Sequence, residues 1–117
     1  MLFVEYPKCS TCRKAKQWLE GQGVAFEDRH IVEQTPTAQE LDIWQQRSGL
    51  PMKKFFNTSG QSYRALGLKE KLDGMSREEQ LALLASDGML IKRPILVLDD
   101  TVLVGFKQEQ WEQALAR

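Results

Sequence analysis

The sequence predicts an α/β fold in which a mixed, four-stranded sheet is flanked by helices. Two observations support this prediction. The first 28 residues show a strand-helix-strand pattern, and the last part of the chain has two short runs of β-formers followed by a helix. We expect a helical insertion at about residues 36–90, between the second and third strands. At 117 residues the chain fits a single domain, residues 1–117, with a core that needs no disulfide or metal for stability.

The opening of the chain predicts two strands joined by a helix. Residues 2–6 read LFVEY, which is rich in β-formers, and Pro7 ends this first strand. A helix is expected at residues 11–22, where apolar side chains recur three and four positions apart before two glycines. Residues 24–28, VAFED, predict the second strand. The inward face of the helix is predicted to carry Cys12, Ala15, Trp18 and Leu19.

The insertion is predicted to consist of helices. Thr37 can cap a helix that ends before Gly49 and Pro51. Ser76 followed by Glu79 is a capping-box pattern, which predicts the start of a further helix. Shorter helical segments are expected at residues 52–56 and 62–66.

The last part of the chain predicts a β-hairpin and a helix. After Pro94 the run ILVL, a turn at Asp99 and Asp100, and the run TVLVG predict the third and fourth strands. A final helix is expected from about Gln108, with Trp111 on its buried face. The two β-rich halves of the chain therefore complete one sheet.

Composition excludes several classes of function. Sixteen basic residues balance sixteen acidic ones, which argues against a general nucleic-acid binder, so we expect no direct nucleic-acid partner. No run of about 18 apolar residues is present, and the N-terminus lacks the pattern of a signal peptide. We therefore expect a cytoplasmic protein without a membrane partner, in which cysteines serve as metal ligands, nucleophiles or reversible redox pairs.

The chain's two cysteines, Cys9 and Cys12, form a C-x-x-C pair. Such a pair is half of a tetrahedral zinc site, but the other half needs two further Cys or His ligands and the chain offers only His30. We therefore expect no metal. We interpret His30 as a surface or loop residue, because no motif of a nucleophilic triad surrounds it.

Cys9 is the candidate nucleophile because it lies just before the N-terminus of the predicted helix. Unpaired backbone N–H groups and the positive end of the helix dipole favour an anion there, and Arg13 and Lys14 add positive charge. Such surroundings lower the pKa of a cysteine below its free value of about 8.5. Cys12, one turn into the helix, is the candidate resolving thiol. Because Cys12 falls on the apolar face, an ordinary buried thiol is the alternative.

The segment KRPI contributes a second group of candidates. Arg93 carries a planar, charged fork suited to oxyanions, and Pro94 can hold a cis bond. A helix N-terminus and an arginine together can form a pocket for a tetrahedral oxyanion. The candidate anion-binding residues are Ser10, Thr11, Arg13, Arg93 and Pro94.

Three motifs occur together: the C-x-x-C pair after the first strand, the segment NTSG followed by YRALGL, and the late RPI. In this order they resemble the arsenate reductase family, which includes ArsC and the regulator Spx. The resemblance covers nearly the whole chain. It implies a thioredoxin/glutaredoxin-like fold, Cys9 as the reactive thiol, and Arg93 beside a cis Pro94. It also implies no bound cofactor, with glutathione and glutaredoxin, or thioredoxin, as the electron donor.

The chain departs from the family's glutaredoxin-coupled reductases at three positions. Asn57 and Gly105 occupy the positions that we match to two further arginines of those enzymes, and Cys12 stands where they tend to have a serine. The chain therefore looks closest to the dithiol C-x-x-C members, whose pair can form an internal disulfide.

Two functions follow from the resemblance. The first is a thiol-disulfide oxidoreductase in which Cys9 attacks an arsenate-like oxyanion or a disulfide and Cys12 resolves the intermediate. The alternative is an Spx-like redox-responsive regulator that binds the C-terminal domain of the RNA polymerase α subunit. Gly49 lies near the glycine region that Spx uses for this contact, although a glycine at this place is also what a helix C-terminus requires.

Overall fold

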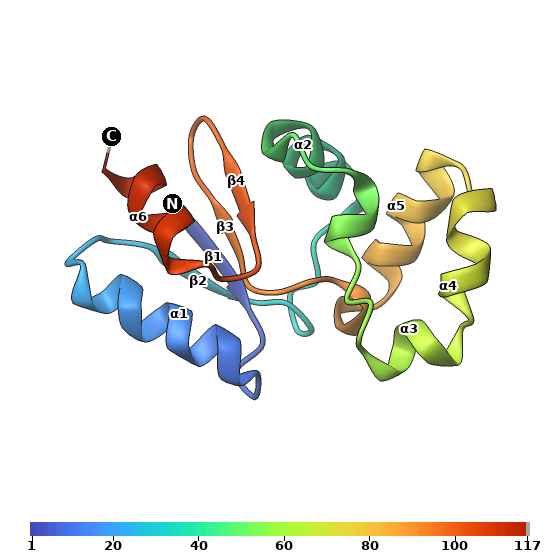
Figure 1. Ribbon diagram of the computed structural model, residues 1–117, viewed down its shortest axis with the longest axis horizontal. Helices are drawn as coiled ribbons and strands as arrows, with labels where there is room; N and C mark the ends of the chain where they lie inside the picture. The colour runs from blue at the N-terminus through green and yellow to red at the C-terminus, as the bar shows by residue number, and fades with distance from the viewer. Residues whose placement is uncertain (117) are drawn as a thin grey trace.

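A computed structural model describes residues 1–116 and contains one mixed, four-stranded sheet (Figure 1). Its strand order is β2-β1-β3-β4, with β1 and β2 parallel and the other two pairs antiparallel. The predicted α/β fold, a mixed four-stranded sheet flanked by helices, is confirmed. The strands are β1 (Leu2–Glu5), β2 (Glu27–His30), β3 (Ile95–Val97) and β4 (Val102–Val104).

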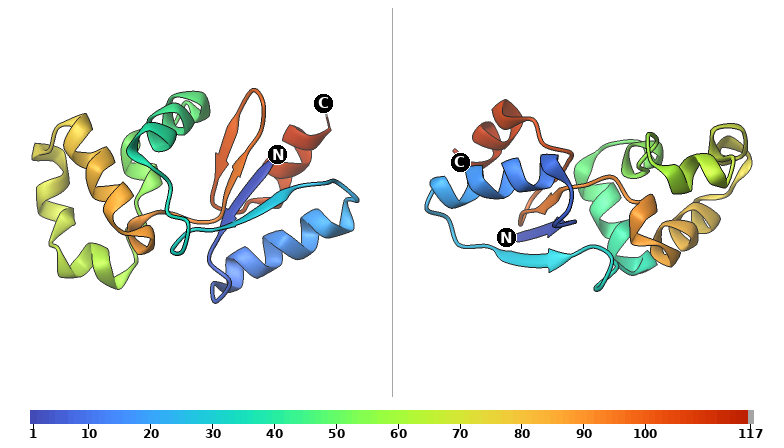
Figure 2. Two further views of the ribbon diagram at one scale, coloured as in Figure 1. Left: turned by 180° about the vertical axis from the view of Figure 1, so that it is seen from behind. Right: turned by 90° about the horizontal axis from the view of Figure 1, so that it is seen from below.

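The two faces of the sheet pack against different helices. Helices α1 (Ser10–Gly21) and α6 (Gln108–Leu115) lie together on one side, while the insertion lies on the other (Figures 1 and 2). Phe3 and Leu96, which pair across β1 and β3, belong to the core shared with α1 and α6. Their neighbours Val4 and Ile95 belong to the core shared with the insertion, because successive strand side chains point to opposite faces.

The second strand lies later in the chain than predicted. The sequence predicted residues 24–28, whereas β2 begins at Glu27, which pairs with Leu2 of β1. Val24 and Phe26 instead pack against the core under α1 and α6, in the connection that precedes the strand. The apolar run that predicted the strand therefore packs against the core, and a polar edge strand follows it.

The insertion connects β2 to β3 through short helical elements (Figure 1). Most of the predicted helices are present within a residue or two, although the predicted segment at 52–56 is a 3₁₀ turn and α4 with η2 was not predicted. The elements are α2 (Ala38–Ser48), η1 (Met52–Phe55), α3 (Gln61–Ala65), α4 (Leu68–Lys71), η2 (Leu72–Gly74), α5 (Arg77–Ser86) and η3 (Gly88–Leu90).

Side-chain caps fix where the two longest helices of the insertion begin. The backbone N–H of Glu79 donates to the Ser76 hydroxyl, and the N–H of Ser76 donates to the Glu79 carboxylate, so the predicted capping box is confirmed. Thr37 and Glu40 form the same pair at α2. Gly49 ends α2 with a φ of +71°, which favours glycine and supports its interpretation as a helix terminus.

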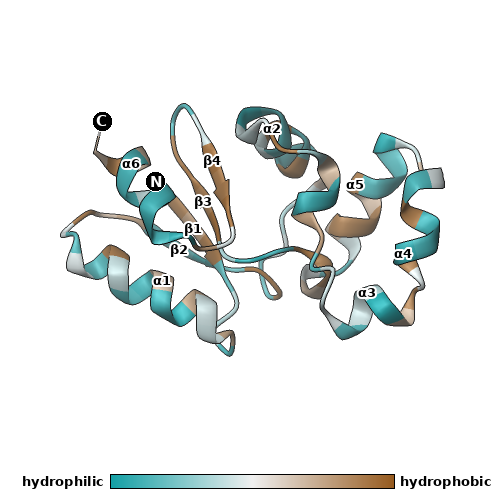
Figure 3. Ribbon diagram, in the orientation of Figure 1, coloured by the Kyte–Doolittle hydropathy of each residue, from teal (hydrophilic) through white to brown (hydrophobic). Residues whose placement is uncertain are grey.

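The apolar residues of the strands and of the inward helix surfaces lie at the centre of the molecule, and the outer helix surfaces are hydrophilic (Figure 3). None of the helices in residues 1–116 is long and apolar enough to cross a membrane.

Candidate functional site

Cys9 is the N-cap residue of α1. The backbone N–H of Cys12 donates to the Cys9 Sγ atom at 3.4 Å, so the sulfur takes the place that a capping oxygen usually holds. Both thiols are free; Cys9 is half-buried and Cys12 is buried. The predicted position of Cys9 at the turn between β1 and α1 is confirmed, and this turn presents its sulfur to a pocket.

The pKa values of the two thiols are shifted in opposite directions. Burial alone would raise the pKa of Cys9, but hydrogen bonds from the Cys12 thiol and backbone, together with nearby Arg93, lower it overall. Burial raises the pKa of Cys12 to about 12, and the neighbouring Cys9 adds to this rise. Cys9 is therefore the thiol that ionises first.

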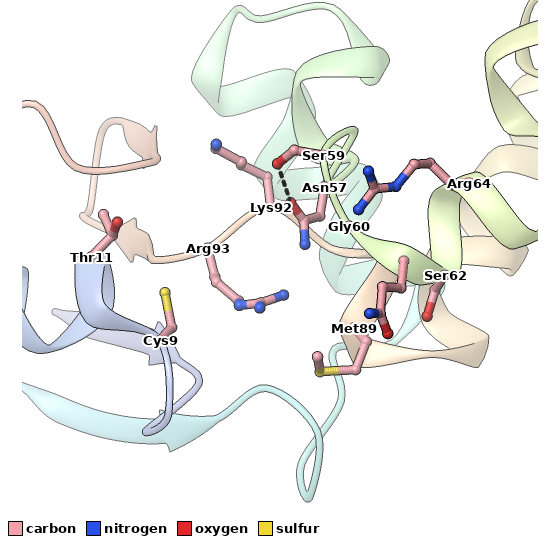
Figure 4. A pocket seen from close by; sticks show the side chains of 11 residues that line it. Cys9, Thr11, Asn57, Ser59, Gly60, Ser62, Arg64, Met89, Lys92 and Arg93 are labelled. Carbon is pink, nitrogen blue, oxygen red and sulfur yellow. Dashed lines mark hydrogen bonds between the residues drawn. The ribbon is translucent and has the colours of Figure 1, made fainter.

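Arg93 extends into the space beside Cys9 (Figure 4). Its guanidinium carbon lies 5.1 Å from the centre of the Tyr6 ring. The Nε and Nη1 atoms are buried and have no hydrogen-bond partner within the described chain. Unsatisfied buried donors are costly, and an anion in the pocket would satisfy them. The expected cis bond between Arg93 and Pro94 is present.

Cys9 and Arg93 line a pocket of about 480 Å³ between the sheet and the insertion, here called the cysteine pocket. The β1–α1 turn and the segment before β3 contribute Cys9, Thr11, Lys92 and Arg93. The insertion contributes residues that include Asn57, Ser59, Ser62, Arg64 and Met89 (Figure 4). This volume is within the range of pockets that hold small organic molecules.

The structure brings some of the predicted site residues together and separates others. Cys9, Thr11 and Arg93 share the cysteine pocket. Ser10 begins α1 and is not one of the residues that line it. Arg13 lines a separate hollow with Glu5 and Lys16, on the side of β2. Pro94 is buried at the start of β3. Arg13 therefore does not share the cysteine pocket with Cys9, although it lies only four residues away in sequence.

The two positions matched to family arginines, Asn57 and Gly105, differ in whether their backbone conformation favours glycine. Asn57 lines the cysteine pocket, so an amide stands where a guanidinium was expected. Gly105 lines the neighbouring hollow and has a φ of +75°, a backbone conformation that disfavours any other residue. The local backbone at Gly105 is therefore shaped for glycine.

Sequence reasoning missed two cations of the pocket, Arg64 and Lys92. Arg64 comes from α3, and its guanidinium is directed toward the pocket (Figure 4). Both residues belong to motifs that the sequence displays, YRALGL and KRPI. What sequence could not supply was the packing of α3 opposite Cys9.

His30 lies at the end of β2 and is half-buried, so it is part of the strand instead of the loop that was expected. Its Nδ1 accepts hydrogen bonds from the backbone N–H groups of Val32 and Glu33. Its ring meets the Tyr6 ring edge to face. Within residues 1–116, no three side chains of metal-binding type cluster together.

Comparison with known proteins places these features in a family. The model of the ArsC family matches residues 4–114. The protein named "Uncharacterized protein YusI" of Bacillus subtilis (strain 168) is 58% identical over 113 residues, which are 97% of this chain and 96% of that protein. "Regulatory protein MgsR" of the same strain is 32% identical over 106 residues, covering 91% of this chain and 82% of its own.

A solved structure also resembles this chain, both in fold and in sequence. The crystal structure of "a possible arsenate reductase from Streptococcus mutans UA159" has a TM-score of 0.87 and 50% identity, covering 95% of this chain and 96% of that chain. Proteins named global transcriptional regulator Spx are more distant relatives, at 23% to 29% identity. The similar proteins thus include one that is named as a possible enzyme and several that are named as regulators.

Proposed function

Because this chain belongs to the ArsC family, we propose that it is a thiol-disulfide oxidoreductase with Cys9 as nucleophile and Cys12 as resolving thiol. The observation that carries this proposal is the placement of the Cys9 sulfur at the N-terminus of α1, near the Arg93 guanidinium, whose buried Nε and Nη1 atoms have no hydrogen-bond partner in the described chain. The helix terminus and the arginine stabilise a thiolate, which is the reactive form of a cysteine.

The proposed reaction reduces a disulfide and oxidises the cysteine pair. The Cys9 thiolate attacks one sulfur of the substrate, which forms a mixed disulfide and releases the other sulfur as a thiolate. Cys12 then loses its proton and attacks the Cys9 sulfur, which releases the reduced substrate and leaves a Cys9–Cys12 disulfide. Two electrons pass to the substrate, and a thiol donor such as glutathione with glutaredoxin, or thioredoxin, returns them.

An arsenate-like oxyanion is the second kind of substrate that this site can serve. The Arg93 donors would bind its oxygens while Cys9 displaces one oxygen as water and forms a thiol–arsenate bond. Attack by Cys12 on Cys9 would then yield the disulfide and the trivalent arsenic product. Asn57 replaces an expected arginine in this pocket, so we place a disulfide substrate first.

Variants of the two cysteines test the mechanism. With a small disulfide and an excess of thiol donor, Cys9→Ser should abolish turnover. Cys12→Ser should retain the first attack and accumulate a mixed disulfide on Cys9, detected by intact mass. Turnover by Cys9→Ser at the wild-type rate, or a mixed disulfide on Cys12 of the unchanged protein, would contradict the assignment of the two roles.

A redox-responsive regulator is the second candidate, and the 32% identity to the regulatory protein MgsR favours it. In this function the Cys9–Cys12 couple would report redox state to the C-terminal domain of the RNA polymerase α subunit. A pull-down with this domain should then recover the chain in one redox state more than in the other. Recovery in neither state would remove this candidate.

A further inference from the structure

Three hollows near Cys9 adjoin one another through shared lining residues. The first is the cysteine pocket. A second hollow of about 390 Å³ shares Thr11, Lys92 and Arg93 with it. A third, of about 430 Å³, shares Lys54 and Lys92 with the second. Lys92 lines all three hollows, so we call them together the basic groove.

The basic groove collects positive charge in a chain whose charges balance overall. The chain has sixteen basic and sixteen acidic residues, yet no described residue lining the groove is acidic. In residues 1–116, no basic residue of the groove forms an ion pair. An acidic partner would therefore meet positive charge that no carboxylate of the described groove residues neutralises. The basic residues are Lys53, Lys54, Arg64, Lys92, Arg93 and Lys107.

The basic groove also offers apolar surface away from Cys9. Leu50 and Phe106, both half-buried, line the second hollow. Lys92 and Arg93 are adjacent in sequence, but the Arg93 side chain extends toward the space beside Cys9 and the Lys92 side chain extends away from it (Figure 4). A single small oxyanion bound at the Arg93 donors beside Cys9 would not also extend along Lys92. A polypeptide can place carboxylates and apolar side chains along both.

We propose that the basic groove binds an acidic segment of a partner protein that carries the disulfide reduced by Cys9. This inference rests on the proposed function and names the class of its substrate. Carboxylates of the segment lie against Lys54, Lys92 and Lys107, and its apolar side chains lie against Phe106. The reaction is the balanced exchange given above, with the two electrons of the cysteine pair passing to the partner's disulfide.

Two synthetic peptides of equal length test this proposal. Each carries one cysteine activated as a 2-thiopyridyl disulfide and one phenylalanine; glutamates flank the cysteine in one peptide and glutamines in the other. Attack by the reduced Cys12→Ser protein releases thiopyridone, and its absorbance gives the second-order rate constant. We expect the acidic peptide to react about tenfold faster at low salt, and the ratio to fall toward one as salt screens the charges.

Variants separate the groove from general electrostatics. The double variant Lys54→Glu with Lys107→Glu should bring the acidic-to-neutral rate ratio to one or below. The double variant Lys69→Glu with Lys71→Glu, which makes the same charge change on α4 outside the groove, should leave the ratio unchanged. Since the salt dependence is measured on the wild-type groove, the test does not depend on the folding of the double variants.

Several results would overturn the proposal. Equal rates for both peptides at low salt would do so, as would stronger inhibition by a single-stranded oligonucleotide than by a disulfide-free acidic peptide. A Cys9 that reacts with neither peptide contradicts the proposed function, and the groove proposal falls with it. The two failures are distinguishable, because the first shows equal rates and the second shows none.

Discussion

Cys9 and Cys12 are only three positions apart in the sequence, but their different surroundings give the two thiols different acidities. The Cys9 sulfur accepts a helix N-terminal hydrogen bond and lies near Arg93, whereas the Cys12 sulfur is enclosed in the core. The pKa of Cys9 is lowered, and burial raises the pKa of Cys12 to about 12. In the proposed mechanism, this difference makes Cys9 the attacking thiol and Cys12 the resolving thiol.

Glu5 shows the same effect of burial on a carboxyl group. It is 4% exposed in β1, with Lys16 Nζ at 3.7 Å and Asp28 on the neighbouring strand. Burial raises its pKa from 4.5 to about 7, Asp28 adds to the rise, and Lys16 opposes it. Arg13 and His30 face the same hollow. The folded state therefore binds this proton more tightly than the unfolded chain does.

The sign of the pH dependence follows from this raised pKa. The stability that protonated Glu5 contributes is fully present below pH 4.5 and is lost as the pH rises through about 7. Glu5→Gln should therefore gain about 2 kcal/mol of unfolding free energy relative to wild type between these pH values. Urea unfolding of both proteins at each pH measures this. A difference between the two proteins that does not change with pH would contradict the account.

At the scale of elements, the insertion is held to the sheet by a close backbone approach. Gly88, in η3, is buried, and a Cβ atom there would lie 2.2 Å from the carbonyl oxygen of Ile31, which follows β2. No side chain larger than glycine's hydrogen fits between these two segments. Ile91, three residues after Gly88, forms an isolated antiparallel β-bridge with Phe56. These contacts position the insertion over the cysteine pocket.

Gly88→Ala should therefore destabilise the protein by about 2 kcal/mol or more, because the backbone must move to admit the methyl group. Gly74→Ala is the matched control: a Cβ there meets nothing within 4 Å and the backbone has no positive φ. Denaturant midpoints of both variants provide the comparison. An equal stability of the two variants would show that η3 can shift without cost.

At the scale of the whole molecule, the cysteine pocket needs both halves of the chain. The sheet with α1 supplies Cys9 and Arg93, while the insertion supplies Asn57 and Arg64. Arg64→Gln should weaken binding of arsenate or sulfate several-fold, because one of the cations that attract the anion is lost. The affinity for the anion is measured from the degree to which the bound anion protects Cys9 from an alkylating reagent. Lys69→Gln, on α4, is the control and should leave protection unchanged.

The parts of this molecule that depend on local sequence could be predicted. Cys9 at a strand-helix turn, the capping box at Ser76 and the cis bond before Pro94 were all expected and are all present. The parts that depend on packing could not. Arg13 was placed in the anion site by its closeness in sequence, whereas Arg64 reaches the pocket only because α3 folds back opposite Cys9.

The pKa of Cys9 tests the central claim most directly. It is measured from the alkylation rate of the reduced Cys12→Ser protein across pH, with and without arsenate; serine keeps a hydroxyl donor beside Cys9. We predict an inflection clearly below the ordinary thiol value of about 8.5, and slower alkylation when arsenate is present. An inflection at or above that value, with no effect of arsenate, would contradict an activated thiolate in an anion pocket.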